Sequence, residues 1–212
     1  MHFEFFLAIL GALFSVVNPL GAIPVFLALT PDYTAGERRA TALRTSIYFA
    51  ILLTAFYFGG TLILQFFGIS LSAMRIAGGL VILASGYGLL YGKMEDSRAV
   101  NKRVREEALR KDDISFSPMA MPMLSGPGSI SLLIGYSGQY AQLDQRATVV
   151  LVIVVLAAVI YGILLSSPAL FRVLGFAGLQ AMTRIMGFIV MAIGVQYVIS
   201  GVVKLATEFL EG

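Results

Sequence analysis

The sequence predicts an all-α integral membrane protein. Its six transmembrane helices are expected to form a 3+3 inverted repeat, with helices 1 and 4 broken near the membrane middle. Three observations predict this fold class. The 212-residue chain is 58% hydrophobic and 13% charged, with a mean hydropathy of +0.87, whereas a soluble domain is about 25% charged. Its charges leave six long uncharged runs. Two of these runs are interrupted by matched proline–glycine motifs.

The uncharged runs predict where the helices lie. They cover residues 5–31, 45–74, 76–92, 114–143, 147–171 and 185–203. About 20 apolar residues cross the hydrocarbon core, and a charge at its centre is disfavoured by about 2.5–3.5 kcal/mol on insertion scales. We therefore predict six helices, over residues 3–29, 43–67, 71–91, 116–139, 147–171 and 182–205.

The two halves of the chain resemble each other, which indicates an internal repeat. Arg75-Ile76-Ala77-Gly78 matches Arg184-Ile185-Met186-Gly187. Each half carries three predicted spans. Because three is an odd number of spans, the second half is inserted in the membrane with the opposite orientation to the first. We therefore expect a first three-helix repeat over 1–92, a cytoplasmic connecting loop over 93–113 and a second three-helix repeat over 114–212.

Basic residues predict the orientation in the membrane. With six spans both termini lie on one side, and that side holds Arg75, Arg146 and Lys204. The other side holds more basic residues, namely Arg38, Arg39, Arg44, Arg172, Arg184 and those of 93–111. Because cytoplasmic loops are enriched in Lys and Arg, we expect both termini outside the cytoplasm.

Small residues recur at a spacing of seven in two of the predicted helices. One stripe is Gly78, Ser85 and Gly92, and the other is Gly187, Gly194 and Gly201. Such stripes let helices approach closely in lipid, where no hydrophobic effect drives their association. We expect these stripes to mark tight helix packing.

The residue types argue against an enzyme. The chain has no Cys, and its single His is His2. It therefore lacks the residues needed for a thiolate nucleophile, a Ser-His-Asp triad or a histidine metal site. No Asp or Glu lies inside the six runs, which weakens a proton relay. We expect no catalysis, no metal, no cofactor and no nucleic-acid partner. The choice of Na+ or H+ as coupling ion is left open.

Two motifs interrupt the first and fourth uncharged runs. They are Asn18-Pro19-Leu20-Gly21-Ala22-Ile23-Pro24 and Met123-Leu124-Ser125-Gly126-Pro127-Gly128-Ser129-Ile130. Proline removes a backbone donor, and glycine loosens the helix around it. In a membrane the freed backbone groups need partners, so a broken helix is tolerated only beside protein or a water-filled cavity. Matched breaks in two halves predict a transporter binding site.

The chemistry of these motifs suits a zwitterion. Asn18 can cap a half-helix that starts at Pro19, and Ser125 and Gly126 can do the same before Pro127. The free N–H groups at each start can bind a carboxylate. The half-helices that end there offer free carbonyl groups for an ammonium. Asn18, Ser125 and Ser129 would add side-chain hydrogen bonds.

The same residues resemble a known family. Asn18-Pro19-Leu20-Gly21 with Pro24, the six spans and Pro122 through Ile130 are similar to the MarC family over essentially the whole chain. This is the neutral amino acid transporter family, with SnatA-like members. The resemblance implies a prokaryotic multi-pass protein of the cell (inner) membrane that moves glycine, alanine, threonine or similar amino acids. Its motifs point to Asn18, Pro19, Gly21, Ser125, Gly126, Pro127, Gly128 and Ser129, with no departure from the family pattern.

The leading hypothesis is therefore a secondary transporter that works by alternating access. Its partners would be a small neutral amino acid and the lipid bilayer. One alternative is an exporter of other small solutes, and another is a membrane scaffold without transport. The direction of transport and the oligomeric state are left open.

Overall fold

The computed structural model describes residues 2–91, 113–140 and 142–211, and within these ranges every regular element is a helix. The elements are α1 (His2–Val17), α2 (Pro19–Leu29), α3 (Ala35–Phe66), α4 (Leu71–Tyr91), the irregular helical segment η1 (Ser115–Leu124), α6 (Pro127–Gln139), α7 (Leu143–Leu165) and α8 (Ser167–Glu211). The prediction of an all-helical protein is confirmed. The predicted connecting loop over 93–113 lies outside the described residues except for Asp113.

Within the described residues, five helices are long and apolar enough to span a membrane. They cover Phe3–Leu29, with its interruption, Ala35–Phe66, Leu71–Tyr91, Leu143–Leu165 and Ser167–Leu210. The predicted fourth span over 116–139, which was expected to be broken, is divided into η1 and α6, each shorter than the roughly 20 residues of a full crossing. In η1 the backbone is extended at Ser117 (φ −127°, ψ 121°) and Met121 (φ −134°, ψ 127°). Each precedes a proline, which disfavours the α conformation of the residue before it.

The second helix starts earlier than predicted, at Ala35 rather than near 43. Thr34 and Glu37 form a capping box: the Glu37 N–H donates to Thr34 Oγ1 at 3.2 Å, and the Thr34 N–H donates to Glu37 Oε2 at 2.8 Å. The first turns of α3 contain several charged residues and were therefore left out of the predicted span. The Thr-x-x-Glu pattern of the capping box is nevertheless present in the sequence.

The last two helices also differ from their predicted bounds. α7 ends at Leu165 rather than near 171, and α8 begins at Ser167. Pro168 lacks an N–H group and is accommodated in the first turn of a new helix. α8 then changes direction at Gly175 (φ 64°, ψ 179°), a conformation that glycine tolerates, and continues beyond the predicted 182–205.

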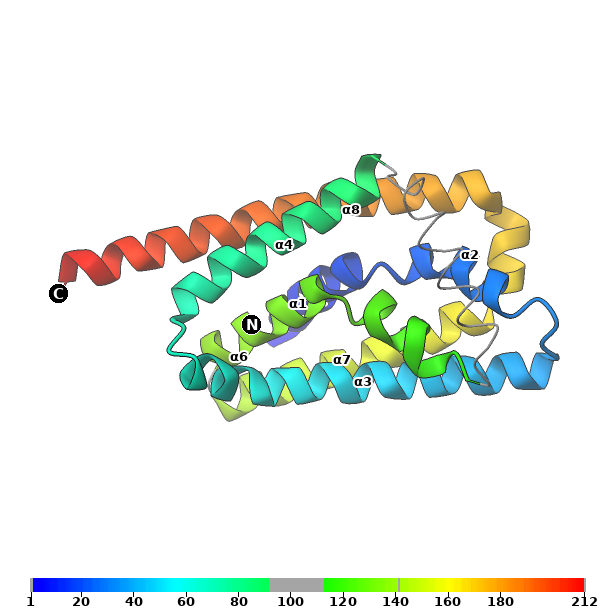
Figure 1. The fold of residues 1–212 in the computed structure, drawn as a ribbon, viewed down its shortest axis with the longest axis horizontal. Helices are drawn as coiled ribbons and strands as arrows, with labels where there is room; N and C mark the ends of the chain where they lie inside the picture. The colour runs from blue at the N-terminus through cyan, green and yellow to red at the C-terminus, as the bar shows by residue number, and fades with distance from the viewer. Residues whose placement is uncertain (1, 92–112, 141, 212) are drawn as a thin grey trace.

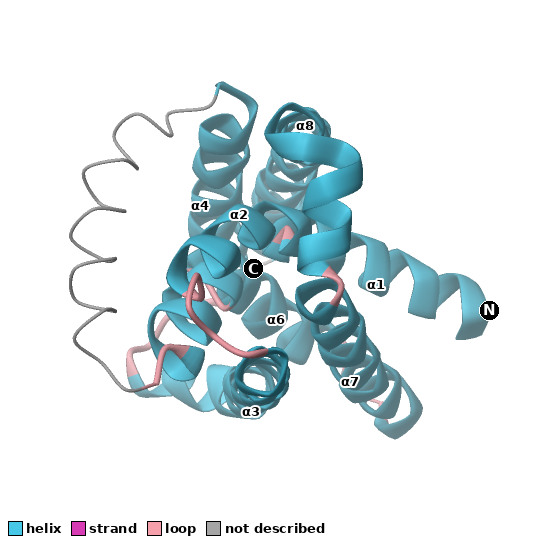
Figure 2. Cartoon of the chain, turned by 90° about the vertical axis from the view of Figure 1, so that its right-hand side faces the viewer, coloured by secondary structure: helices cyan, strands magenta, loops and turns pink. Residues whose placement is uncertain are grey.

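The helices are arranged in three layers (Figure 1). α3 and α7 pack together on one side, and α4 packs along α8 on the other. The interrupted helices α1–α2 and η1–α6 lie between these pairs and contact both of them, as the end-on view also shows (Figure 2). Both interruptions are thereby placed in the centre of the bundle.

Glycines determine how closely α4 and α8 approach. A Cβ atom on Gly79 would lie 2.8 Å from the Gly194 carbonyl oxygen, and one on Gly86 would lie 2.8 Å from that of Gly187. The expectation that Gly187 and Gly194 mark tight packing is confirmed, and Gly78 also packs tightly, but against α6 and not against α8. Gly78 faces Ser131 of α6, and Gly92 is outside the described residues. Glycines 79 and 86 share the spacing of seven, so periodicity alone could not choose between the two sets.

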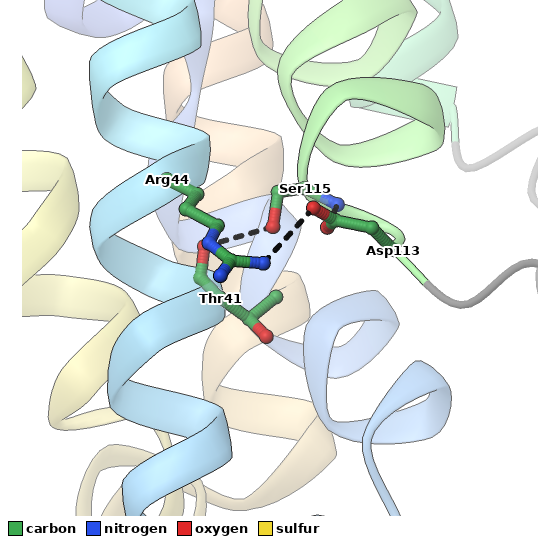
Figure 3. A network of polar contacts seen from close by, with 4 residues as sticks. All are labelled: Thr41, Arg44, Asp113 and Ser115. Atoms are coloured by element: carbon green, nitrogen blue, oxygen red, sulfur yellow. Dashed lines mark hydrogen bonds and ion pairs between the residues drawn. The ribbon is translucent and has the colours of Figure 1, made fainter.

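A polar network joins the start of the second half to α3 (Figure 3). Arg44 Nη1 lies 3.3 Å from Asp113 Oδ2, and the Ser115 N–H donates to Asp113 Oδ1 at 2.8 Å. Ser115 Oγ donates to the Thr41 carbonyl oxygen at 3.4 Å. Burial raises the pKa of Asp113, but the Ser115 hydrogen bonds and the Arg44 charge together outweigh it, so that the pKa lies below its ordinary value of 3.8.

This pKa shift predicts a pH-dependent contribution to stability. A carboxylate with a lowered pKa stabilises the fold above the unfolded-state pKa of about 3.9, and the contribution is lost as pH falls through the folded-state pKa. We expect Asp113→Asn to reduce stability at pH 7 by less than about 1 kcal/mol, because the Arg44 pair is exposed. In thermal unfolding the variant and the unmodified protein should converge as pH falls through the folded-state pKa of Asp113. A constant difference across pH 7 to 3 would contradict this assignment.

Candidate functional site

A cavity of about 310 Å³ lies between the two helix interruptions. The ends of α1 and η1 and the first turns of α2 and α6 form its walls, and α4 and α8 each contribute further residues. Its volume is at the lower end of the roughly 300–1,000 Å³ typical of small-molecule sites. The cavity therefore suits a small solute.

The first interruption is centred on Asn18, which adopts a left-handed conformation (φ 48°, ψ 61°) between α1 and α2. This conformation is uncommon outside glycine, although Asn tolerates it better than most residues. Asn18 occupies the N-cap position as predicted, but its side chain makes no capping hydrogen bond. Its Oδ1 is buried without a partner in the described chain. Pro24, which was predicted to belong to the interruption, lies inside α2 instead.

The second interruption separates η1 from α6. Gly126 (φ −79°, ψ 172°) is the N-cap residue, and Pro127 starts the helix. Ser125 does not cap α6: its Oγ is buried and finds no partner among the described residues. Ser129 Oγ donates to the Gly126 carbonyl oxygen at 3.0 Å. Both interruptions thus contain a buried polar side-chain atom whose hydrogen-bonding capacity is unused.

Backbone N–H groups at the interruptions lie at helix starts. Those of Leu20, Gly128 and Ser129 belong to the first turns of α2 and α6. These are first-turn groups, which lack an acceptor in their own helix. At the end of α1, Pro19 has no N–H to offer the Ser15 carbonyl. The site therefore combines N–H donors with carbonyl acceptors.

The cavity brings together most of the residues that the sequence predicted. Six of them line it, namely Asn18, Gly21, Gly126, Pro127, Gly128 and Ser129. Pro19 and Ser125 are buried next to lining residues but do not line the cavity themselves. The cavity is also lined by Ser85 of α4 and Thr183 of α8, neither of which was predicted as a site residue. Ser85 was noted only for its spacing, and no local motif marks Thr183.

The lining of the cavity contains no charged side chain. Within the part of the chain that the structure describes, no cluster of three His, Cys, Asp or Glu residues could hold a metal ion. The polar groups are amide, hydroxyl and peptide groups, set among apolar walls such as Val16, Leu89 and Met123. Such a site can bind a solute by hydrogen bonding and by shape.

Exposure differs between the cavity lining and the rest of α6. Ser85, Pro122 and Pro127 line the cavity and are exposed. Residues 131–137 of α6, in contrast, are all buried. Beyond them Arg75, only 8% exposed, donates from Nη2 to Gln139 Oε1 at 2.8 Å. This contact joins α4 to the end of α6.

The helices and their central uncharged cavity define a multi-pass integral membrane protein. Residues 3–206 match the family model described as MarC family integral membrane protein, and the chain belongs to this family. The resemblance inferred from the two motifs is thereby confirmed.

The chain is similar to several named members. The UPF0056 membrane protein MJ1677 of Methanocaldococcus jannaschii is 36% identical over 202 residues, which cover 95% of this chain and 98% of that protein. The UPF0056 membrane protein YhcE of Escherichia coli K12 is 35% identical, covering 95% and 92%. The UPF0056 inner membrane protein MarC of the same strain is 33% identical, covering 94% and 95%. No solved structure matches the chain significantly.

Proposed function

We propose that the protein is a secondary transporter of small neutral amino acids such as glycine, alanine or threonine. The observation that carries this proposal is the uncharged cavity of about 310 Å³ between two interrupted helices, lined by the first turns of α2 and α6. An amino acid is zwitterionic, so it needs donors and acceptors but no net compensating charge. Half-helix ends that converge on a central cavity are the arrangement by which broken helices bind substrates in transporters.

The substrate carboxylate accepts hydrogen bonds from first-turn N–H groups of α2 and α6, where the helix dipoles are positive. The ammonium donates to unpaired carbonyls at the end of α1 and to Asn18 Oδ1, which is buried without a partner in the described chain. Gly126 and Gly128 line the cavity without adding side chains to it, and so leave space for the substrate. Small side chains are thus accepted and large ones are excluded.

Transport proceeds by alternating access between two inverted three-helix repeats. α4 and α8 are the third helices of the two repeats, and their glycine contact forms the seam between them. The Arg75–Gln139 contact closes the cavity on one face, and it must open when the opposite face closes. Since Arg38, Arg39 and Arg44 lie in the first part of α3, we assign that end of α3 to the cytoplasm and both termini to the outside. One relative is named an inner membrane protein, and we propose the same location for this chain.

The test is uptake of labelled glycine, alanine and threonine into liposomes that contain the purified protein. Sodium and proton gradients are imposed separately, because the two ions are alternative coupling ions. We expect saturable uptake of at least one amino acid, and stimulation by one gradient identifies the ion. A folded, correctly inserted protein that takes up and releases none of the three would overturn the proposal. In that case a panel of other small solutes would be tested for export.

A further inference from the structure

We propose that Thr183 of α8 is a substrate-binding residue, and that its hydroxyl acts with the Asn18 carboxamide to hold the carboxylate of the amino acid. This inference rests on the proposed transport function. It adds a third element to the site, because the two sequence motifs lie only on α1–α2 and η1–α6.

Thr183 combines burial with an unused hydroxyl. It lines the cavity, and it is only 5% exposed. Within the described chain its Oγ1 makes no hydrogen bond, whereas the hydroxyls of Ser85 and Ser129 are bound to the carbonyls of Val81 and Gly126. Because Thr183 borders the cavity, its hydroxyl is free to bond to a molecule held there. A ligand in the cavity would supply the missing partner.

The position of Thr183 relative to Asn18 follows from Gly21. A Cβ atom on Gly21 would lie 2.5 Å from Asn18 Nδ2 and 3.4 Å from Thr183 Oγ1. The carboxamide therefore packs directly over Gly21, and the Thr183 hydroxyl lies beside it, within reach of the same ligand group. Like Thr183 Oγ1, Asn18 Nδ2 makes no hydrogen bond within the described chain.

The chemistry of this pair favours a carboxylate over an ammonium. Asn18 Nδ2 can only donate, and the Thr183 hydroxyl can donate as well. Gly21 lies in the first turn of α2, where the helix dipole is positive. Two side-chain donors beside a positive helix end are suited to the anionic half of a zwitterion. The substrate would then connect α2 of the first half to α8 of the second.

The experiment measures binding of alanine and of alaninamide, which lacks the carboxylate, to the purified full-length protein. Thr183→Val removes the hydroxyl at nearly constant volume, and Thr183→Ser keeps it. The matched control is Thr207→Val on the same helix, because Thr207 is exposed and its hydroxyl bonds only to carbonyls of α8. We expect Thr183→Val to raise the Kd for alanine about tenfold or more. Thr183→Ser should stay within about threefold of the unmodified protein, Thr207→Val should be unchanged, and alaninamide binding should be indifferent to Thr183→Val.

The outcomes separate the inference from the function on which it rests. Alanine binding by Thr183→Val with unmodified affinity would overturn the role of Thr183 and leave the transport proposal standing. If Thr183→Val and Thr183→Ser weakened alanine binding equally, Thr183 would have a packing role instead. If Thr183→Val weakened the binding of alanine and of alaninamide equally, the carboxylate assignment would be overturned. If the unmodified protein neither binds nor transports any neutral amino acid, the proposed function fails and this inference fails with it.

Discussion

Replacement of Gly128 by leucine is expected to abolish amino acid uptake while the protein stays folded. Gly128 lines the cavity in the first turn of α6, where the N–H groups have no acceptor within that helix. A Cβ atom there would lie 3.2 Å from Val16 Cγ1, 3.6 Å from Ile82 Cγ1 and 3.8 Å from Ser85 Oγ. These are side-chain atoms that can shift, so the fold can tolerate the change. The rest of the leucine side chain would occupy the space proposed for the substrate.

Uptake of labelled alanine into proteoliposomes is the measurement, with size-exclusion chromatography as the check on folding. Uptake by Gly128→Leu should fall to the level of empty liposomes. The matched control is Gly162→Leu on α7, where a Cβ atom meets nothing within 4 Å and the residue is exposed. That variant should transport normally. Normal uptake by Gly128→Leu would show that substrate does not pass through this cavity.

The second large effect is expected from Gly194→Ala at the contact between α4 and α8. The added Cβ would lie 2.6 Å from the Leu83 nitrogen and 2.8 Å from the Gly79 carbonyl oxygen. Both atoms belong to the backbone, so the helices themselves must separate to accommodate one methyl group. Overpacking of this kind destabilises proteins by about 1–3 kcal/mol. For a chain of this size, each kcal/mol lowers Tm by about 2–4 °C.

Thermal unfolding of the purified protein in detergent tests this expectation. Gly88→Ala on α4 is the control, because a Cβ atom at that position meets nothing within 4 Å. It should leave Tm unchanged or raise it slightly, since alanine favours helices more than glycine does. If Gly194→Ala matched the Gly88→Ala control in Tm, α4 and α8 could not lie as close as the structure places them.

The two motifs illustrate how far local sequence information reaches. Pro19 and Pro127 lack an N–H group wherever they occur, and each starts a helix in the structure. The positions of both interruptions were therefore predictable from the motifs. The capping hydrogen bonds were not predictable from the motifs. The side chains of Asn18 and Ser125 make no such bond, although both residue types are favoured at helix N-caps. Their side-chain directions depend on what packs around them, which a motif does not contain.

By itself, the sequence determined that this protein is a helical, membrane-embedded member of its family. It also located the two interruptions that flank the cavity. These properties follow from hydropathy and from missing backbone donors, which act over a few neighbouring residues. Only the tertiary structure decided that Gly79 and Gly86, rather than Gly78 and Ser85, face α8. It also decided that Thr183 lines the cavity. Both depend on how helices are rotated and bent against one another, and a turn such as that at Gly175 changes every contact that follows it along α8.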